Sequence, residues 1–214
     1  MVYYVLFLSF LPADIQQPAL AIFYKMMLDV LMSAIEELKF CPVCKANLLK
    51  EEIGGEPRMA CSSMTCSYVY WNNPTPVLAA IAHRENEVVL VQGIGWPGHW
   101  FSLVTGFHEA GESAEEGTLR EVKEELGLDG EIGSLVGVYS YFQMNQVIIA
   151  YEVLLGKGEI KLDATELVDY KVVPIDKIKT WPSGTGYAVR DWLLSQGRQT
   201  EEISFDRLKK NKPQ

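Results

Sequence analysis

Three glutamates recur at helical spacing between Arg120 and Leu128, and this segment restricts the chain more than any other. Glu121, Glu124 and Glu125 stand at positions i, i+3 and i+4, so on an α-helix their carboxylates share one face. Like charges at this spacing repel each other by roughly a few tenths of a kcal/mol per pair. The apolar residues of the segment mark the other side of the helix: Leu119, Val122 and Leu126. The sequence therefore predicts a helix with a buried back and a convergent acidic face.

Convergent carboxylates suit a hard divalent cation. Mg²⁺ and Mn²⁺ prefer oxygen ligands, and they retain coordination positions for water and for substrate phosphates. Taken alone, the Glu-x-x-Glu-Glu spacing is also typical of a solvated surface helix. The residues before it therefore decide between a cation site and a solvated face.

The segment from Gly106 to Glu112 is predicted to be a tight loop ahead of this helix. Gly106 and Gly111 allow the backbone to approach a phosphate closely. Glu112 lies eight residues before Arg120, and a carboxylate–guanidinium pair there would tie the loop to the helix. Ser113 is a good N-cap, and a glycine follows the last helical residue, so we expect a helix over 113–126.

The complete spacing resembles the Nudix box. It runs from Gly106 through five residues to Glu112, through seven more to Arg120-Glu121, and on through Glu124-Glu125 to Gly127 and an aliphatic residue. The resemblance implies an α/β fold, the Nudix α/β/α sandwich with a mixed sheet. It also implies hydrolysis, with Mg²⁺ or Mn²⁺ as cofactor, of nucleoside diphosphates linked to another group.

The same resemblance assigns roles to individual residues. It implies that Glu121, Glu124 and Glu125 are the Mg²⁺ or Mn²⁺ ligands, and that Glu112 and Arg120 form a structural ion pair. Glu109 stands where the family often adds an acidic residue near the metals. The catalytic base stays open among Glu125, Glu121 and a distal-loop glutamate, here Glu166, for which a plain surface role is the alternative. The Pro-Gly that usually precedes the box glycine is replaced by Val104-Thr105.

A second motif precedes the box. Cys41-x₂-Cys44 and Cys61-x₄-Cys66 are two thiol pairs separated by sixteen residues. Zn²⁺ takes four soft ligands in a tetrahedron, and two such pairs supply them. Four thiolates leave no open position, so the zinc would be structural. The alternative is four reduced thiols that only pack together.

A zinc ribbon directly ahead of a Nudix domain resembles the NADH pyrophosphatase group and its relatives. These include enzymes that act on NADH or NAD, FAD and ADP-ribose, and the resemblance covers roughly residues 40–194. The proline-rich signature of NADH pyrophosphatases is absent, because the corresponding stretch is VYSYFQMNQ, residues 138–146. Tyr139, Tyr141 and Phe142 are candidates to stack on a base, with ordinary strand-face packing as the alternative.

Four regions are expected. Residues 1–39 form an apolar or helical extension, 40–71 the zinc ribbon, 75–197 the Nudix domain and 198–214 a polar tail. The extension packs as a helix on the body or a partner, or anchors weakly at a membrane surface, or is absent because translation starts at Met27 or Met32. Its first eleven residues are too short to span a bilayer as a helix.

Further elements follow from local patterns. Strands are expected at 77–82, 87–91, 136–142, 147–155 and 170–173, and a closing helix at 187–194. Residues 93–100 form a glycine-rich loop in which His99 and Trp100 either line the substrate mouth or pack.

Composition limits the partners. The 214-residue chain has a formal net charge of −9 and is 48% hydrophobic, which indicates a packed core and disfavours nucleic acid as a partner. A small-molecule nucleotide is the expected partner, with a homodimer as a further possibility by analogy, and the cytoplasm is the expected location. The alternatives to dinucleotide hydrolysis are removal of an NAD-type cap from RNA and non-catalytic nucleotide sensing.

Overall fold

The computed structural model describes residues 38–96 and 100–203. The extension expected over 1–39 lies outside them except for its last two residues, as do His99 and the end of the polar tail. The chain divides into two compact units, with the boundary between Asn73 and Pro74.

The first unit holds a small antiparallel sheet of β1 (Leu48–Ile53), β2 (Glu56–Cys61) and β3 (Val69–Tyr70), in that order. Gly54 and Gly55 both adopt positive φ, which allows the tight turn between β1 and β2. The buried hydrophobic residues described here are few: Cys41, Leu48 and Ala60. A core of this size does not hold a fold by apolar burial alone.

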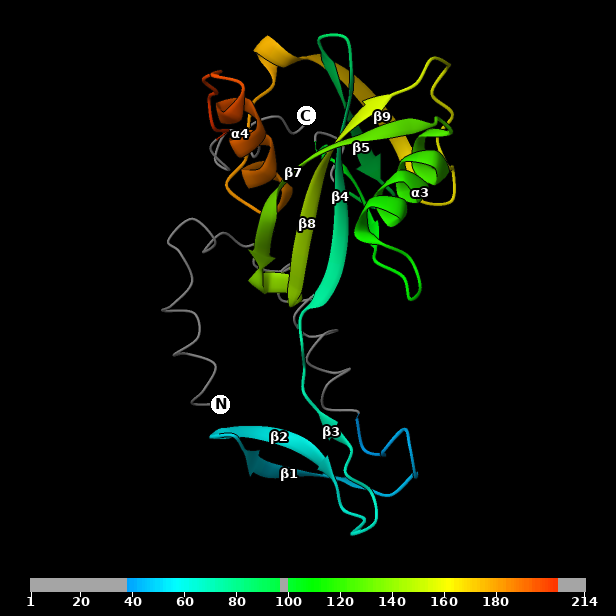
Figure 1. The fold of residues 1–214 in the computed structure, drawn as a ribbon, viewed down its shortest axis with the longest axis vertical. Coiled ribbons are helices and arrows are strands. Elements are labelled where there is room, and N and C mark those ends of the chain that lie inside the picture. The colour runs from blue at the N-terminus through cyan, green and yellow to red at the C-terminus, as the bar shows by residue number, and fades with distance from the viewer. Residues whose placement is uncertain (1–37, 97–99, 204–214) are drawn as a thin grey trace, which may run out of the picture. The chain divides into compact units, whose positions relative to one another are not determined.

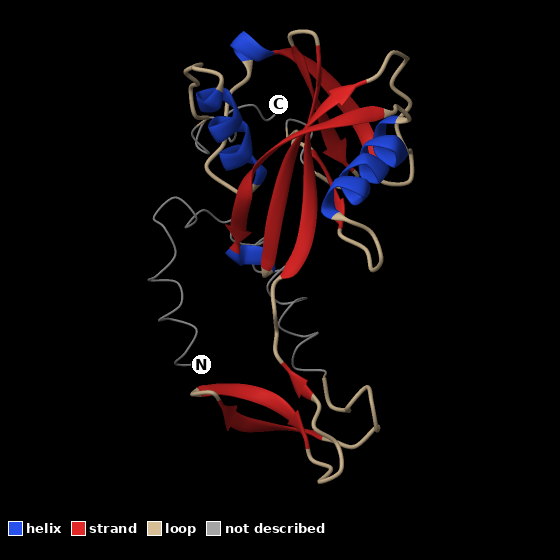
Figure 2. Cartoon of the chain, in the orientation of Figure 1, coloured by secondary structure: helices blue, strands red, loops and turns tan. Residues whose placement is uncertain are grey.

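The second unit is a mixed six-stranded sheet with helices on both faces (Figures 1 and 2). The strand order is β7-β8-β4-β5-β9, and β6 also pairs with β4. The strands are β4 (Thr75–Arg84), β5 (Glu87–Gly93), β6 (Val104–Phe107), β7 (Gly130–Tyr141), β8 (Gln146–Leu155) and β9 (Leu167–Pro174). Neighbours β4 and β8 run parallel, and the other pairings are antiparallel.

The helices α3 (Ala114–Leu126) and α4 (Thr185–Ser195) each cover one core cluster. Alternation along β4 divides its buried residues between the two faces, because successive side chains point to opposite sides. Ala79 and Ile81 pack with Trp192 of α4, whereas Ala80 and Ala82 pack with Val122 of α3. Two short 3₁₀ turns, η2 (Phe142–Met144) and η3 (Ile175–Lys177), complete the unit.

The expected α/β class with a mixed sheet is confirmed, as are the two helices. Three local predictions were wrong. Gly106 lies in strand β6 and not in a loop, because residues 104–107 pair with β4. β7 begins at Gly130, well before the predicted start, since register shifts near Leu135 break the alternation that marks a strand. Phe142 belongs to η2 and not to the strand.

Within the residues that the structure describes, no helix is long and apolar enough to cross a membrane.

Candidate active site and cysteine cluster

Local sequence chemistry determines both ends of α3. Ser113 caps the N-terminus: its side chain accepts a hydrogen bond from the backbone N–H of Glu116, and the Glu116 side chain accepts one from the backbone N–H of Ser113. This reciprocal capping box satisfies two N–H groups at the start of the helix. Gly127 ends the helix in the left-handed conformation, with φ of 69°. These caps fix where the helix begins and ends, and they therefore fix the positions of the three glutamates that it carries.

Two glycines let α3 lie close to its surroundings. A side chain on Gly106 would occupy the space filled by the Glu121 carboxylate. A side chain on Gly117 would meet Glu112 and Leu78 of β4. Gly117 was not among the residues selected from the sequence, although a glycine inside a predicted helix costs stability relative to alanine and so indicates a packing requirement.

Arg120 ties the box loop to α3. Its Nε and Nη2 donate to the two carboxylate oxygens of Glu112, at 3.0 and 2.9 Å, and Nη2 also donates to the carbonyl oxygen of Phe107 at 3.1 Å. The bidentate geometry combines charge with orientation. The Arg120 guanidinium, and then the backbone N–H of Glu109, hold the pKa of Glu112 down at about 2. Glu112 is therefore a fixed anion of the loop.

The remaining nitrogen of Arg120 joins two of the expected metal ligands. Its Nη1 donates to Glu121 at 2.7 Å and to Glu124 at 3.0 Å. Among the described residues, the four cysteines bring three or more ligand atoms close enough to hold an ion, whereas the glutamates of α3 are not gathered in this way. Like charges separate unless a cation lies between them, and here the guanidinium is the cation nearest to Glu121 and Glu124.

The environment of Glu125 disfavours the charged form of its carboxyl group. It is 5% exposed, and its Oε2 is buried without a hydrogen-bond partner among the described residues. Burial first, and then the charge of Glu121, raise the pKa of Glu125 to about 8. Burial likewise raises the pKa of Glu121. An orphaned carboxylate oxygen beside a second buried carboxylate fits a site for a hard divalent cation. Glu121, Glu124 and Glu125 are the side chains that would hold it.

The loop before β9 brings Glu166 toward α3. The charge of Glu166 contributes, after burial, to the raised pKa of both Glu121 and Glu125. Asp163 of the same loop also acts on Glu125, and its backbone N–H donates to the Glu125 carbonyl oxygen at 3.2 Å. Glu166 was a candidate from the sequence but Asp163 was not, because only the docking of this loop on α3 brings Asp163 to the site.

Of the remaining residues selected from the sequence, Glu109 is exposed, and Gly111 adopts φ of 97°, which favours glycine. Tyr139 and Tyr141 pack against the core cluster beneath α4, and the Tyr139 hydroxyl donates to Asp191 at 3.1 Å. Phe142 is 87% exposed. The strand-face alternative therefore describes the two tyrosines and not Phe142.

A second polar group lies on the face covered by α4. The Glu152 carboxylate accepts from Trp192 Nε1 at 3.0 Å and from Ser134 at 3.1 Å, and His83 Nε2 lies 3.1 Å from it. These contacts join β8 to α4 and to β7, on the opposite side of the sheet from the glutamates of α3. We assign the group a role in packing.

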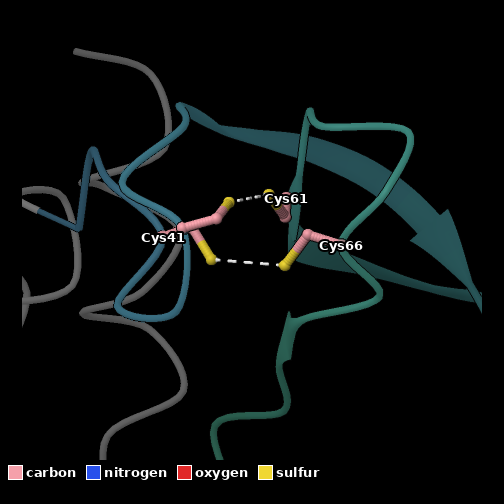
Figure 3. A group of neighbouring side chains, drawn as sticks. Cys41, Cys61 and Cys66 are labelled. Atoms are coloured by element: carbon pink, nitrogen blue, oxygen red, sulfur yellow. Dashed lines mark hydrogen bonds between the residues drawn. The ribbon is translucent and has the colours of Figure 1, made fainter.

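The four cysteine sulfurs converge in the first unit (Figure 3). All lie within 4.8 Å of one another, with Cys41 and Cys66 at 3.8 Å and Cys44 and Cys61 at 3.3 Å. Zn–S bonds of about 2.3 Å in a tetrahedron separate the sulfurs by about 3.8 Å. The cluster therefore has close to the dimensions of a four-thiolate zinc site.

The pKa values of the Cys41 and Cys61 thiols are shifted in opposite directions. Burial opposes ionisation of Cys41, but backbone hydrogen bonds from Cys44 and Val43 outweigh it and lower the pKa to about 7. At Cys61 a backbone hydrogen bond from Ser63 favours the thiolate, yet burial and the neighbouring sulfurs raise the pKa to about 12. Four thiolates at this distance need a cation, and zinc is the ion that four cysteines select.

Comparison with known proteins identifies the family. A model described as NUDIX domain matches residues 73–192, which is more than half of the chain. The chain belongs to the NUDIX domain family.

Two relatives have names that state an activity. The chain is 27% identical over 135 residues to the NAD-capped RNA hydrolase NudC of Vibrio parahaemolyticus, covering 63% of this chain and 50% of that protein. It is 38% identical over 74 residues to the ADP-ribose pyrophosphatase of Methanocaldococcus jannaschii, covering 34% of this chain and 44% of that protein. The chain spans about half the length of the curated relatives it matches.

A solved structure agrees on the fold. A NUDIX hydrolase from Nitrosomonas europaea superimposes with a TM-score of 0.62 at 24% identity, covering 77% of this chain and 96% of that one. At that identity the likeness establishes the fold alone.

Proposed function

We propose that this protein hydrolyses the pyrophosphate bond of a dinucleotide and releases a nucleoside monophosphate, using Mg²⁺ or Mn²⁺. The observation that carries the proposal is the buried Glu125 carboxylate, whose Oε2 has no hydrogen-bond partner among the described residues, next to the buried carboxylate of Glu121. A buried carboxylate oxygen without a partner costs stability unless a cation or a proton is supplied.

The residues divide the chemistry among them. A divalent cation, when bound, supplies charge neutralisation of the phosphates and acidifies a coordinated water. Glu121, Glu124 and Glu125 hold the cation, and the Arg120–Glu112 pair fixes the loop in which Gly111 leaves the backbone open to a phosphate. Glu166 approaches from the opposite loop and serves as the base that takes the proton from water, with Glu125 and Glu121 as the other candidates.

The substrate class rests on the relatives. Proteins named NAD-capped RNA hydrolase and ADP-ribose pyrophosphatase both act on a nucleoside diphosphate derivative. We therefore propose NADH or NAD, FAD and ADP-ribose as the substrates to examine.

The test is a panel of these dinucleotides with Mg²⁺ or Mn²⁺, with release of AMP as the readout. Turnover is expected to need the cation and to stop when it is chelated. Glu125→Gln is expected to lower kcat by about 10²- to 10⁴-fold while the protein stays folded. Glu131→Gln, at an exposed position of β7, is the matched control and is expected to retain wild-type turnover. No turnover of any dinucleotide with either metal refutes the proposal and leaves NAD-cap removal and nucleotide sensing as the candidate functions.

A second candidate is removal of an NAD-type cap from RNA, which the names of several relatives favour. The net charge of −9 opposes tight binding of an RNA body, because phosphate contacts depend on basic residues. We expect free NADH to be hydrolysed with a kcat/KM at least equal to that of NAD-capped RNA. A clear preference for the capped RNA would reverse this order.

We further propose that Cys41, Cys44, Cys61 and Cys66 bind one structural Zn²⁺, on the grounds of their convergence. About one zinc per chain is expected by elemental analysis.

A further inference from the structure

The loop between β8 and β9 is seated on the end of α3. The backbone N–H of Lys161 donates to the Leu126 carbonyl oxygen at 2.9 Å, and that of Asp163 donates to the Glu125 carbonyl oxygen at 3.2 Å. These carbonyls belong to the last turn of the helix, where no intrahelical donor remains. The loop thus caps the turn that carries Glu125.

Asp163 also organises the residues that follow it. Its Oδ1 accepts hydrogen bonds from the Thr165 backbone N–H at 2.8 Å and from the Thr165 hydroxyl at 2.7 Å. Its carbonyl oxygen accepts from the backbone N–H groups of Glu166 at 3.2 Å and Leu167 at 2.9 Å. One residue therefore contacts the helix on one side and closes the turn that contains Glu166 on the other.

The backbone of Glu166 is held from both sides. The Glu166 N–H donates to the carbonyl oxygen of Asp163, and the Glu166 carbonyl oxygen accepts from the N–H of Ile94, the residue after β5, at 2.8 Å. The Glu166 side chain itself is exposed. The position of its backbone in this turn is therefore fixed by hydrogen bonds, and its charge acts on Glu121 and Glu125.

We propose that Asp163 is the positioning residue of the site, coupling the end of α3 to the turn that directs Glu166 at the substrate water. The Asp163 backbone makes the contact with α3, and its side-chain oxygen Oδ1 closes the turn at Thr165. The part of the role that a substitution can remove is this acceptor oxygen and not the negative charge. The inference rests on the proposed function, and it names a residue that acts through Glu166 without touching the substrate.

The test is a double-mutant cycle measured as kcat and KM on ADP-ribose with Mg²⁺. Asp163→Ala is expected to lower kcat by about tenfold to a hundredfold with KM changed less than about twofold, because misplacing a catalytic group affects the chemical step. In the Glu166→Gln background the same change is expected to have little further effect. Asp163→Asn keeps the acceptor oxygen and is expected to restore most of the wild-type kcat.

A readout without turnover accompanies the cycle. Amide hydrogen exchange by NMR is expected to accelerate at Glu166 and Leu167 in Asp163→Ala and to stay unchanged in Asp163→Asn. Asp169→Ala, at an exposed aspartate on β9, is the control and is expected to leave both kcat and these amides as in the wild type.

The outcomes separate the two proposals. A wild-type protein that hydrolyses nothing sinks the proposed function, whereas exchange still reports whether Asp163 holds the turn. An active wild type refutes the inference alone if Asp163→Ala keeps full kcat. The inference is also refuted if the losses of kcat from Asp163→Ala and Glu166→Gln multiply in the double mutant. It is refuted as well if the kcat of Asp163→Asn is as low as that of Asp163→Ala.

Discussion

Arg120 donates hydrogen bonds to three carboxylates from one guanidinium, and the number of these bonds differs between the carboxylates. Glu112 receives two parallel hydrogen bonds and keeps its charge at every ordinary pH. Glu121 and Glu124 share the third nitrogen, although they are also expected to serve a metal. The pair with Glu112 is thus the permanent contact, and it is the one that the eight-residue spacing predicted.

The stability of the loop should depend on pH through Glu112. Its pKa lies at about 2 in the folded chain against an ordinary value of 4.5. A lowered pKa stabilises the fold above pH 4.5, and this contribution is lost as pH falls through the range from 4.5 to about 2. We expect wild type to exceed Glu112→Gln in free energy of unfolding at pH 7, with the difference shrinking toward pH 2.

Urea denaturation at pH 7, 4 and 3 measures this difference. Glu109→Gln, at an exposed position of the same loop, is the control and should track the wild type at each pH. A difference between wild type and Glu112→Gln that stays constant from pH 7 to pH 3 would show that Arg120 does not stabilise the charged carboxylate.

At the scale of elements, α3 was predictable because its boundaries are set by neighbours in the chain. Ser113 and Gly127 supply their caps whatever the rest of the molecule does. β6 was not predictable, since Gly106 becomes a strand residue only by pairing with Leu78 of β4. The role of Asp163 was hidden for the same reason, because its partners lie 38 residues away in α3 and two residues along in its own turn.

The N-cap of α3 gives a test at this scale. Ser113→Ala removes the hydroxyl that accepts from Glu116 N–H, and we expect the free energy of unfolding to fall by about 1 kcal/mol. Ser113→Thr keeps an acceptor and should lose much less. Chemical denaturation of the two variants measures the contrast, and equal stabilities would mean that the cap does not hold the helix start.

At the scale of the whole molecule, the two units have different sources of stability. The unit that starts at Pro74 has a core cluster on each face of its sheet, built from β4, β5 and β8 with the two helices. The described part of the other unit has few buried hydrophobic residues, and its four thiol sulfurs lie within 4.8 Å of one another. The Cys spacing predicted this unit, whereas its three strands carry no pattern strong enough to have been predicted.

Zinc removal should therefore act on one unit only. With a zinc-selective chelator and excess Mg²⁺, hydrogen exchange by mass spectrometry should show residues 41–61 losing protection while α3 and β8 retain theirs. The reason is that the proposed zinc would hold a ribbon whose own core is small, whereas the larger unit has a core cluster on each face of its sheet. Cys44→Ser should reproduce the effect, and Ser63→Ala, from the same ribbon but without a ligand sulfur, should not.

If residues 41–61 keep full protection after the zinc content falls to zero, packing of reduced thiols holds the ribbon. If α3 loses protection together with the ribbon, the two units unfold as one, and the boundary at Pro74 is not a boundary of stability.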